Sequence, residues 1–444
     1  MTYPEVIQYL ASFINYEKIV DYPYKESLKL ERIREFLNII GNPQASLKCI
    51  HVCGTKGKGS TCAFIAYILG ACGFRVGLYT SPHLVDFRER IRILAPEGIG
   101  LETGDDFAGI ISEEDLTQHI HKLRSKIDSY NRSSQYGPLS FFEVYTALAF
   151  DYFKAKKVDF AVLETGLGGR LDATNAADAL VCAITPISYE HAQKLGNTLA
   201  EITAEKSGII KNSKQVVVSA AQEKEAQQVI RQRASAIGCR LYEVGRDILY
   251  EGSRESFNVI APFSEYPLLK IQLIGRHQLM NASVAVAVVD CLRLFGVYVG
   301  ISSVRSGLGR ARWPGRCEVI AEKPLIVLDG AQNIASAKAI KEAIRQNFHY
   351  SRLILLFGIS QDKDIEGVCN ELSQLADIVI LTKADNPRAA RPEELAAYFQ
   401  DKPAYITRSI KEAKSNLQAI AREDDLVLVT GSLFVVGEFR HVQI

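Results

Sequence analysis

The 444-residue sequence has few features of a membrane, secreted or nucleic-acid-binding protein. Its nine cysteines are scattered without Cys-x-x-Cys spacing, which predicts neither a zinc site nor a disulfide framework. A formal net charge of +1 gives no electrostatic basis for binding nucleic acid or an anionic membrane. The N-terminus lacks the basic and apolar blocks of a signal peptide, and no apolar run approaches the roughly 20 residues that span a bilayer. We therefore expect a cytoplasmic protein without nucleic-acid or membrane partners.

Length and composition predict a folded protein with more than one domain. Hydrophobic residues make up 47% and charged residues 23% of the chain, and 444 residues exceed a single ordinary core. The segment Trp313-Pro-Gly-Arg316 interrupts the pattern of helices and strands. We therefore predict an N-terminal domain over residues 1–311, a hinge over 312–316 and a smaller C-terminal domain over 317–444.

The most informative stretch is the glycine-rich segment Gly54-Thr-Lys-Gly-Lys-Gly-Ser60. An apolar run over 47–52 predicts a buried strand before it, and residues 61–69 have the composition of a helix. Backbone N–H groups in such a turn close around phosphate oxygens at the positive end of the helix. Lys58 adds a charge, and the Ser60 and Thr61 hydroxyls lie where P-loops hold Mg²⁺. The alternative is a glycine-rich surface turn, but the strand and helix on either side favour a nucleotide site.

Strands and helices alternate along both predicted domains. Apolar runs over 75–79, 158–163, 180–185 and 216–219 predict further strands with helices between them, which favours a parallel sheet. Residues 240–273 alternate apolar and polar positions and predict a few antiparallel strands. In the second domain, strands are predicted over 325–328, 353–357, 378–381 and 426–429. The predicted fold class is α/β, with a P-loop parallel-sheet ATPase domain followed by a smaller doubly wound, Rossmann-like domain.

Polar residues follow these strands at the edge where ligands of open α/β sheets gather. Ser81 follows the strand over 75–79, Glu164 follows the strand over 158–163, and His191 comes after the strand over 180–185. A carboxylate at a strand end facing a P-loop is the usual second anchor for Mg²⁺ in NTPases. We therefore expect Glu164 to contact a metal rather than to be a solvated loop residue, with His191 as a candidate ligand. Lys206, by contrast, is predicted from sequence alone to be a solvated lysine on a short helix.

Together these segments resemble the folylpolyglutamate synthase and dihydrofolate synthase branch of the Mur ligase family. The resemblance extends from Leu28 to Glu438 and rests on the order and spacing of several motifs. Besides the glycine-rich segment, these motifs are Thr80-Ser-Pro-His83, Arg88-Glu-Arg-Ile91, Glu164 through Asn175, Glu205-Lys-Ser-Gly208, His277-Gln-x-x-Asn281 and Pro314-Gly-Arg316.

The resemblance implies an amide ligase that depends on ATP and on one or two Mg²⁺ ions. ATP would phosphorylate a carboxylate of dihydropteroate or of a reduced folate, and the amino group of L-glutamate would displace phosphate from the acyl phosphate. Such chemistry requires positioning and charge neutralisation rather than a nucleophile triad. Whether dihydropteroate, tetrahydrofolate or both are acceptors stays open. We expect a monomer with these small-molecule substrates.

The resemblance also assigns roles to individual residues. Lys58, Lys206 and His191 would be catalytic, and Lys206 falls on the lysine that the family carbamylates, which requires a depressed pKa. The metal ligands would be Ser81, Glu164 and His191. The nucleotide would be held by Lys56, Gly57, Lys58, Gly59, Ser60, Asn281, Arg316 and Asp329. The substrates would be held by Ser140, Phe141, Phe142, Glu143, Leu171, Asp172, Ala173, Gln332 and Ser432.

Three residues depart from the family pattern. Lys56 stands where bacterial members mostly have asparagine, although eukaryotic members carry lysine there. Glu190 replaces the usual aspartate beside the metal-binding histidine. Gln332 replaces a histidine associated with the incoming glutamate, and glutamine cannot carry a charge. Two alternatives therefore accompany the main interpretation: a related ligase with a different acceptor, and a nucleotide-binding paralogue without catalytic activity.

Overall fold

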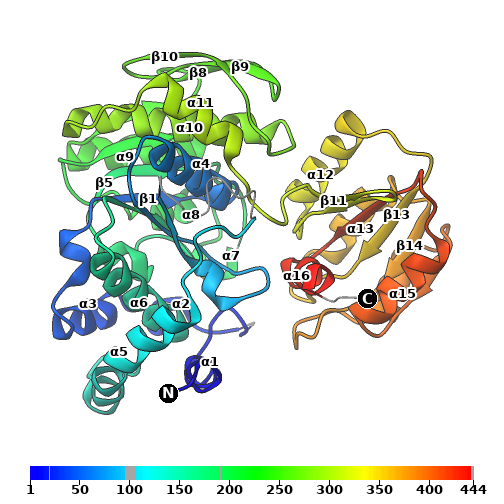
Figure 1. Cartoon of the computed structure of the whole chain (residues 1–444), viewed down its shortest axis with the longest axis horizontal. Helices are drawn as coiled ribbons and strands as arrows, with labels where there is room; N and C mark the ends of the chain where they lie inside the picture. The colour runs from blue at the N-terminus through cyan, green and yellow to red at the C-terminus, as the bar shows by residue number, and fades with distance from the viewer. Residues whose placement is uncertain (20, 96–105, 191, 442–444) are drawn as a thin grey trace. The chain divides into compact units, whose positions relative to one another are not determined.

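The computed structural model describes residues 1–19, 21–95, 106–190 and 192–441 (Figure 1). The chain forms two compact units. Unit 1 comprises Met1–His83, Phe87–Gln272 and Gln278–Arg312, and unit 2 comprises Leu84–Asp86, Leu273–His277 and Trp313–Ile444. The chain passes from unit 1 into unit 2 for the last time between Arg312 and Trp313.

Unit 1 is built around a seven-stranded sheet with the order β3-β2-β4-β1-β5-β6-β7. All neighbouring pairs are parallel except β2 and β3, so the predicted parallel sheet is confirmed. The central strands are buried on both faces, which explains why the sequence shows them as continuous apolar runs. The strands are β1 (Cys49–Cys53), β2 (Val76–Tyr79), β3 (Ile91–Leu94), β4 (Phe160–Glu164), β5 (Ala179–Ile184), β6 (Val216–Ser219) and β7 (Arg240–Glu243).

Helices cover both faces of this sheet, and the one that follows β1 starts earlier than predicted. It begins at Lys58 rather than at residue 61, because Gly57 takes the left-handed conformation and ends the turn directly before it. The α-helices of unit 1 are α1 (Tyr3–Ala11), α2 (Tyr24–Ser27), α3 (Leu30–Ile39), α4 (Lys58–Ala71), α5 (Glu113–Ser133), α6 (Phe141–Ala155), α7 (Ala192–Leu195), α8 (Leu199–Ser207), α9 (Lys224–Ile237), α10 (His277–Cys291) and α11 (Ile301–Arg310). Short 3₁₀ turns are η1 (Pro43–Ser46), η2 (Phe87–Arg90), η3 (Ala173–Ala176) and η4 (Leu292–Phe295).

Helix α10 is buried around its whole circumference and is mostly apolar, with a few buried polar residues such as Gln278, Asn281 and Asp290. The stretch His277–Phe295 is long and apolar enough to cross a membrane by length and composition. However, 78% of its apolar window is buried inside the structure, as expected of a core helix. A three-stranded antiparallel sheet of the order β10-β9-β8 lies beside α11 in Figure 1, which confirms the antiparallel strands predicted within residues 240–273. Its strands are β8 (Leu249–Ser253), β9 (Ser256–Ile260) and β10 (Glu265–Leu269). The first strand of that region, β7, instead joins the main sheet in parallel.

Unit 2 contains a six-stranded sheet with the order β11-β12-β16-β13-β14-β15. Its strands are parallel except for β11 at one edge, so the predicted α/β fold class is confirmed in this unit too. The two edge strands were not predicted, since they are short and largely exposed. The strands are β11 (Glu318–Glu322), β12 (Leu325–Leu328), β13 (Leu353–Phe357), β14 (Ile378–Leu381), β15 (Ala404–Ile406) and β16 (Leu426–Thr430). The helices are α12 (Ile334–Asn347), α13 (Ile365–Ser373), α14 (Pro392–Leu395), η5 (Ala396–Tyr398), α15 (Ile410–Ile420) and α16 (Leu433–His441).

The contact between α11 and α4 generates a stability prediction. A Cβ atom at Gly307 would lie 2.4 Å from the Cα atom of Ile68, which belongs to the α4 backbone, whereas a Cβ atom at Gly309 would meet nothing within 4 Å. Gly307→Ala should therefore overpack the contact and lower the free energy of unfolding by about 1–3 kcal/mol. Gly309→Ala in the same helix should raise it by up to about 1 kcal/mol, because alanine favours the helix. Urea unfolding of both variants tests this, and equal effects would show that the close contact is absent.

Candidate active site

The glycine-rich turn after β1 is pressed against two neighbouring elements. A Cβ atom at Gly54 would lie 2.0 Å from Thr185 Oγ1 beyond the end of β5. A Cβ atom at Gly57, where φ is +81°, would lie 2.2 Å from the Oδ1 atom of Asn281 on α10. Both positions therefore require glycine, for space and for conformation. The turn is further fixed because the backbone N–H groups of residues 55 and 56 donate to the carbonyl oxygen of Pro186.

The start of α4 provides a site for an anion. Its first helical hydrogen bond runs from the N–H of Thr61 to the carbonyl oxygen of Gly57. The N–H groups of Lys58, Gly59 and Ser60 come before this bond and therefore have no acceptor within the helix. These amides and the helix dipole together favour a phosphate group at this end. The Thr61 hydroxyl is also buried and has no hydrogen-bond partner among the described residues.

Helix α10 supports this turn through two amide side chains. Asn281 donates to Gln278 Oε1 at 2.9 Å, and Gln278 donates to the Ser60 hydroxyl at 3.3 Å. The structure thus brings the predicted nucleotide residues Gly57, Ser60 and Asn281 together. Gln278 was not among the predicted site residues, although it lies inside the motif that ends at Asn281.

Three lysines surround the glycine-rich turn. The ammonium groups of Lys58 and Lys206 both donate to the carbonyl oxygen of Gly54, at 3.2 Å and 2.8 Å. Lys56 forms an ion pair with Glu190 at 3.1 Å. The prediction from sequence alone that Lys206 is solvated is wrong, since its exposed fraction is only 4%. The turn is therefore a strongly cationic place, as a polyphosphate site must be.

The buried amine of Lys206 has an unusual pKa. Burial in unit 1 lowers the pKa of Lys206 to about 8, and the nearby positive charges of Lys58 and Lys56 act in the same direction. The thiol of Cys53 and the carboxylate of Glu190 oppose the shift. A pKa near 8 gives the amine a substantial neutral fraction under mildly basic conditions, and the neutral form is the nucleophilic one.

Two of the three predicted metal ligands meet at adjacent strand ends. The backbone N–H of Ser81, just after β2, donates to Glu164 Oε2 at 3.1 Å, and Glu164 ends the neighbouring strand β4. Hydroxyl and carboxylate oxygens are ligands that suit Mg²⁺. The third predicted ligand, His191, lies outside the described residues. Within the described part of the chain no cluster of three His, Cys, Asp or Glu residues could hold a metal by itself.

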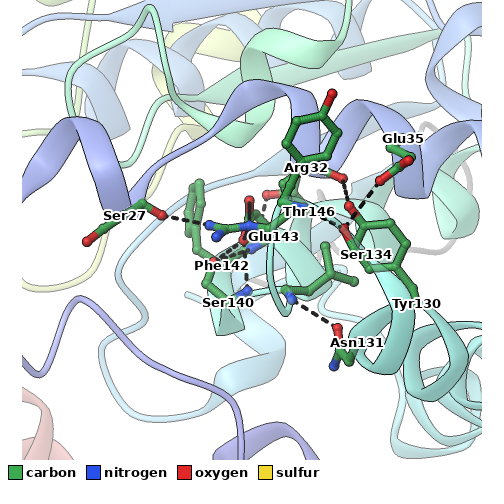
Figure 2. A network of polar contacts seen from close by, with 12 residues as sticks. Ser27, Arg32, Glu35, Tyr130, Asn131, Ser134, Ser140, Phe142, Glu143 and Thr146 are labelled. Atoms are coloured by element: carbon green, nitrogen blue, oxygen red, sulfur yellow. Dashed lines mark hydrogen bonds and ion pairs between the residues drawn. The ribbon is translucent and has the colours of Figure 1, made fainter.

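The predicted substrate residues at the start of α6 belong to a buried polar network (Figure 2). Ser140 caps α6, and its backbone N–H and hydroxyl both donate to Glu143 Oε2, at 2.8 Å and 2.6 Å. The Nε atom of Arg32 donates to the same carboxylate at 2.8 Å, and its Nη2 atom donates to the carbonyl oxygen of Ser27. The carboxylate of Glu143 is therefore engaged inside the protein. Arg32 was missed from sequence, because it lies 111 residues away from Glu143 and no local motif connects the two.

The aromatic residues beside this network differ in exposure. Phe141 is buried, and its ring packs under the guanidinium group of Arg90, whose carbon atom lies 5.2 Å from the ring centre. Phe142 is only partly buried and lies near Tyr79. Of the predicted substrate residues 140–143, Phe142 therefore retains the most accessible side chain. The binding roles of all four stay predictions.

The glycine-rich loop after β4, residues 166–175, is organised by Asp172. Its Oδ2 atom accepts the N–H groups of Gly166 and Leu167 at 2.8 Å and 3.0 Å, and its Oδ1 atom accepts the N–H and hydroxyl of Thr174. Burial raises the pKa of Asp172, while these hydrogen bonds lower it. Of the predicted substrate residues in this loop, Ala173 is buried and Leu171 is partly exposed.

In unit 2 the predicted residues Arg316 and Asp329 lie close together. A Cβ atom at Gly330 would be 2.7 Å from Arg316 Nη1 and 2.4 Å from the side chain of Leu433. The loop that starts at Asp329 therefore lies against Arg316 and Leu433. Asp329 accepts the N–H groups of residues 317 and 331, and burial raises its pKa while Arg316 opposes the shift.

The two residues predicted to hold glutamate also belong to unit 2. The backbone N–H of Gln332 donates to Ser336 Oγ in the turn that starts α12. Ser432 is buried after β16 and lines a small crevice with Ser360 and Asn386, at the carboxyl ends of β16, β13 and β14. Ligands commonly bind at such strand ends in α/β sheets. The substrate-binding roles of Gln332 and Ser432 stay predictions.

Two family models match the chain. Residues 139–289 match the Mur ligase middle domain, and residues 315–433 match the glutamate ligase domain of Mur ligases. The first lies in unit 1 except for residues 273–277, and the second lies in unit 2.

Individual proteins match over almost the full length. The chain is 33% identical to a dihydrofolate synthase/folylpolyglutamate synthase of Bacillus subtilis, over 93% of this chain and 94% of that protein. The structure of Mycobacterium tuberculosis folylpolyglutamate synthase complexed with ADP is similar, with a TM-score of 0.86, 27% identity and coverage of 99% of this chain and 97% of that one. Escherichia coli FolC in complex with DHPP and ADP gives a TM-score of 0.84 with 28% identity and the same coverage.

The lowered pKa of Lys206 predicts a specific pH dependence of stability. Between about pH 8 and 10.5 the folded chain binds fewer protons at this amine than the unfolded chain, so the free energy of unfolding rises with pH across this window. Lys206→Met should lose this rise, which amounts to on the order of 2–3 kcal/mol. Urea unfolding of both proteins in CO₂-free buffers from pH 7 to 10.5 measures the difference. A constant difference at all pH values would contradict the burial-lowered pKa.

Proposed function

The chain belongs to the folylpolyglutamate synthase/dihydrofolate synthase family of Mur ligases, and on that basis we propose that it uses ATP to join L-glutamate to a pteroyl or folyl acceptor. The observation that carries this proposal is the cationic turn around Gly54. The side chains of Lys58 and Lys206 both bond its carbonyl oxygen at the amino end of α4, next to the strand ends that carry Ser81 and Glu164. Lys58 keeps its positive charge whether or not Lys206 is carbamylated. This arrangement suits a reaction in which negative charge develops on a transferring phosphoryl group.

The proposed reaction has two steps. First, a carboxylate oxygen of the acceptor attacks the γ-phosphorus of ATP, ADP leaves, and an acyl phosphate forms. The amino nitrogen of L-glutamate then attacks the acyl carbon, and inorganic phosphate leaves as the C–O bond breaks. The amine gives up a proton, and the product is an amide. Neither step requires a protein nucleophile, which agrees with a site made of cations and backbone amides.

We assign the phosphate contacts to the amides of residues 57–60 and to the side chain of Lys56, with Lys58 neutralising the transferring charge. Asn281 would contact the nucleotide from α10. In unit 2, Arg316 and Asp329 would provide further nucleotide contacts. These roles are supported by the convergence of Gly57, Ser60 and Asn281 in unit 1 and by the proximity of Arg316 to the loop at Asp329 in unit 2.

A magnesium ion would be held by Ser81 and Glu164, with His191 as the third protein ligand. The oxygen donors of Ser81 and Glu164 fit this cation, whereas a histidine nitrogen is an unusual ligand for it and rests on family membership. The bound ion would supply charge neutralisation on the phosphate oxygens. The protein's own contribution is to keep Glu164 buried next to Ser81, so that the carboxylate is oriented before the nucleotide arrives.

We propose that Lys206 is carbamylated. Its neutral nitrogen would attack the carbon of CO₂, a proton would leave the nitrogen, and a carbamate with a negative charge would result. The burial of Lys206 and its pKa of about 8 support this proposal, because they provide the neutral amine that the addition requires. We also propose that the protein works in the cytoplasm as a monomer.

The acceptor would contact the half-buried side chains Phe142 and Leu171, and glutamate would be bound by Gln332 and Ser432. Unlike the histidine it replaces in the family pattern, Gln332 would recognise a carboxylate only through a neutral amide.

The first test is turnover of the purified protein with ATP, Mg²⁺ and L-glutamate, using dihydropteroate and tetrahydrofolate as separate acceptors. We expect phosphate release and a product heavier by one glutamyl residue with at least one acceptor. Lys58→Ala should reduce kcat by 10²-fold or more, because it removes a charge that acts on the transferring phosphoryl group. Circular dichroism controls for folding. Absence of product with both acceptors would refute the function, and wild-type turnover of the variant would refute the role of Lys58.

The replacement at position 332 predicts a change in amino-acid recognition. Gln332→His should change the KM for L-glutamate by about threefold or more, since a ring that can carry charge replaces a neutral amide. The KM for ATP should stay within about twofold, because Gln332 has no proposed nucleotide contact. Steady-state kinetics with each substrate varied in turn measures both values. Equal shifts in the two constants would contradict the assignment of Gln332 to glutamate.

A further inference from the structure

One face of β1 contacts the loop of residues 166–175 at two points. Side chains alternate along the strand, so Cys49, His51 and Cys53 lie on the same face. The Sγ atom of Cys53 donates to the carbonyl oxygen of Gly168 at 3.0 Å. Two residues earlier, His51 Nε2 lies 2.8 Å from the hydroxyl of Thr174. The strand that leads into the nucleotide turn therefore also holds the loop that carries the proposed acceptor residues.

The direction of each hydrogen bond in this contact follows from the donors available. The two carboxylate oxygens of Asp172 receive four donors, one of which is the Thr174 hydroxyl at 2.5 Å. The hydroxyl has a single proton, which it gives to Asp172, so it must accept from His51. His51 therefore carries its proton on Nε2. Its Nδ1 atom is buried and has no hydrogen-bond partner among the described residues.

The ring of His51 stays neutral. Its exposed fraction is 1%, and burial lowers the pKa of His51 to about 3, with Lys211 acting in the same direction. A neutral ring has one N–H donor, and that donor points to Thr174. The sequence could fill this buried position on β1 with an apolar residue, which would leave no unpaired nitrogen. A histidine here costs stability and provides one directed hydrogen bond.

A series of hydrogen bonds connects His51 with the backbone of the loop. Through the Thr174 hydroxyl it reaches Asp172, and through Asp172 it reaches the N–H groups of Gly166 and Leu167. The loop thus keeps its shape through a chain of side-chain hydrogen bonds that starts on β1. The proposed acceptor contact Leu171 directly precedes Asp172, in the loop that these hydrogen bonds hold.

We propose that His51 is a positioning residue for the acceptor site. Its hydrogen bond to Thr174 fixes the 166–175 loop relative to β1, the strand that leads into the nucleotide turn. This inference rests on the proposed function, because that function assigns the acceptor to the loop. It predicts a selective effect: loss of the hydrogen bond should weaken binding of the acceptor while the nucleotide turn, held separately by Thr185 and Asn281, keeps its shape.

Four variants test this inference by steady-state kinetics with dihydropteroate or tetrahydrofolate. His51→Asn is too short to reach Thr174, and Thr174→Val removes the hydroxyl at nearly constant shape. Each should raise the KM for the acceptor about tenfold and leave the KM for ATP within about twofold. His51→Gln places an amide near the Nε2 position and should stay within about threefold of wild type. The double variant His51→Asn with Thr174→Val should be no worse than Thr174→Val alone, because that single variant already removes the hydrogen bond to His51 together with the one to Asp172.

Hydrogen exchange measured by mass spectrometry provides a readout that does not need turnover. In His51→Asn and Thr174→Val, peptides covering residues 166–175 should exchange faster than in wild type, while peptides covering residues 54–61 should not change. An inactive wild-type protein would refute the proposed function, and the exchange data would still decide the role of His51. Unchanged exchange at 166–175 would overturn the inference. So would equal rises in both KM values, which would show general loosening instead of positioning.

Discussion

The carbonyl oxygen of Gly54 is the point on which the site depends. It accepts hydrogen bonds from Lys58, at the start of α4, and from Lys206, near the end of α8. One backbone oxygen thus brings two cations from distant parts of the chain to the same turn. Burial and the positive charge of Lys58 lower the pKa of Lys206, and the Glu190 carboxylate opposes this shift. The other features of the site are arranged around this concentration of positive charge.

Buried polar networks support the loops near this turn. Glu143, Asp172 and Asp329 were all predicted to touch ligands, yet each of their carboxylates accepts hydrogen bonds from the surrounding chain. A carboxylate engaged in this way fixes the backbone around it and leaves neighbouring side chains to make contact with a ligand. A sequence motif identifies such carboxylates, but it does not show whether they bind a ligand or hold the backbone of the loop.

Much of the fold could be predicted from sequence, because apolar runs and glycine-rich turns are local signals. The strand before Gly54 and the strand that ends at Glu164 both follow from such signals. Pairings across long sequence separations could not be predicted. The burial of Lys206 and the ion pair between Arg32 and Glu143 depend on tertiary packing, which no spacing along the chain reveals.

The tight fit of the nucleotide turn has a thermodynamic consequence. Because Gly54 and Gly57 leave no room for even a methyl group against Thr185 and Asn281, folding alone fixes the backbone of the turn. A nucleotide then meets amides that are already oriented, and its binding does not have to order them. The conformational entropy of this segment is lost once, when the protein folds. Binding of each new nucleotide therefore does not lose free energy to ordering the turn.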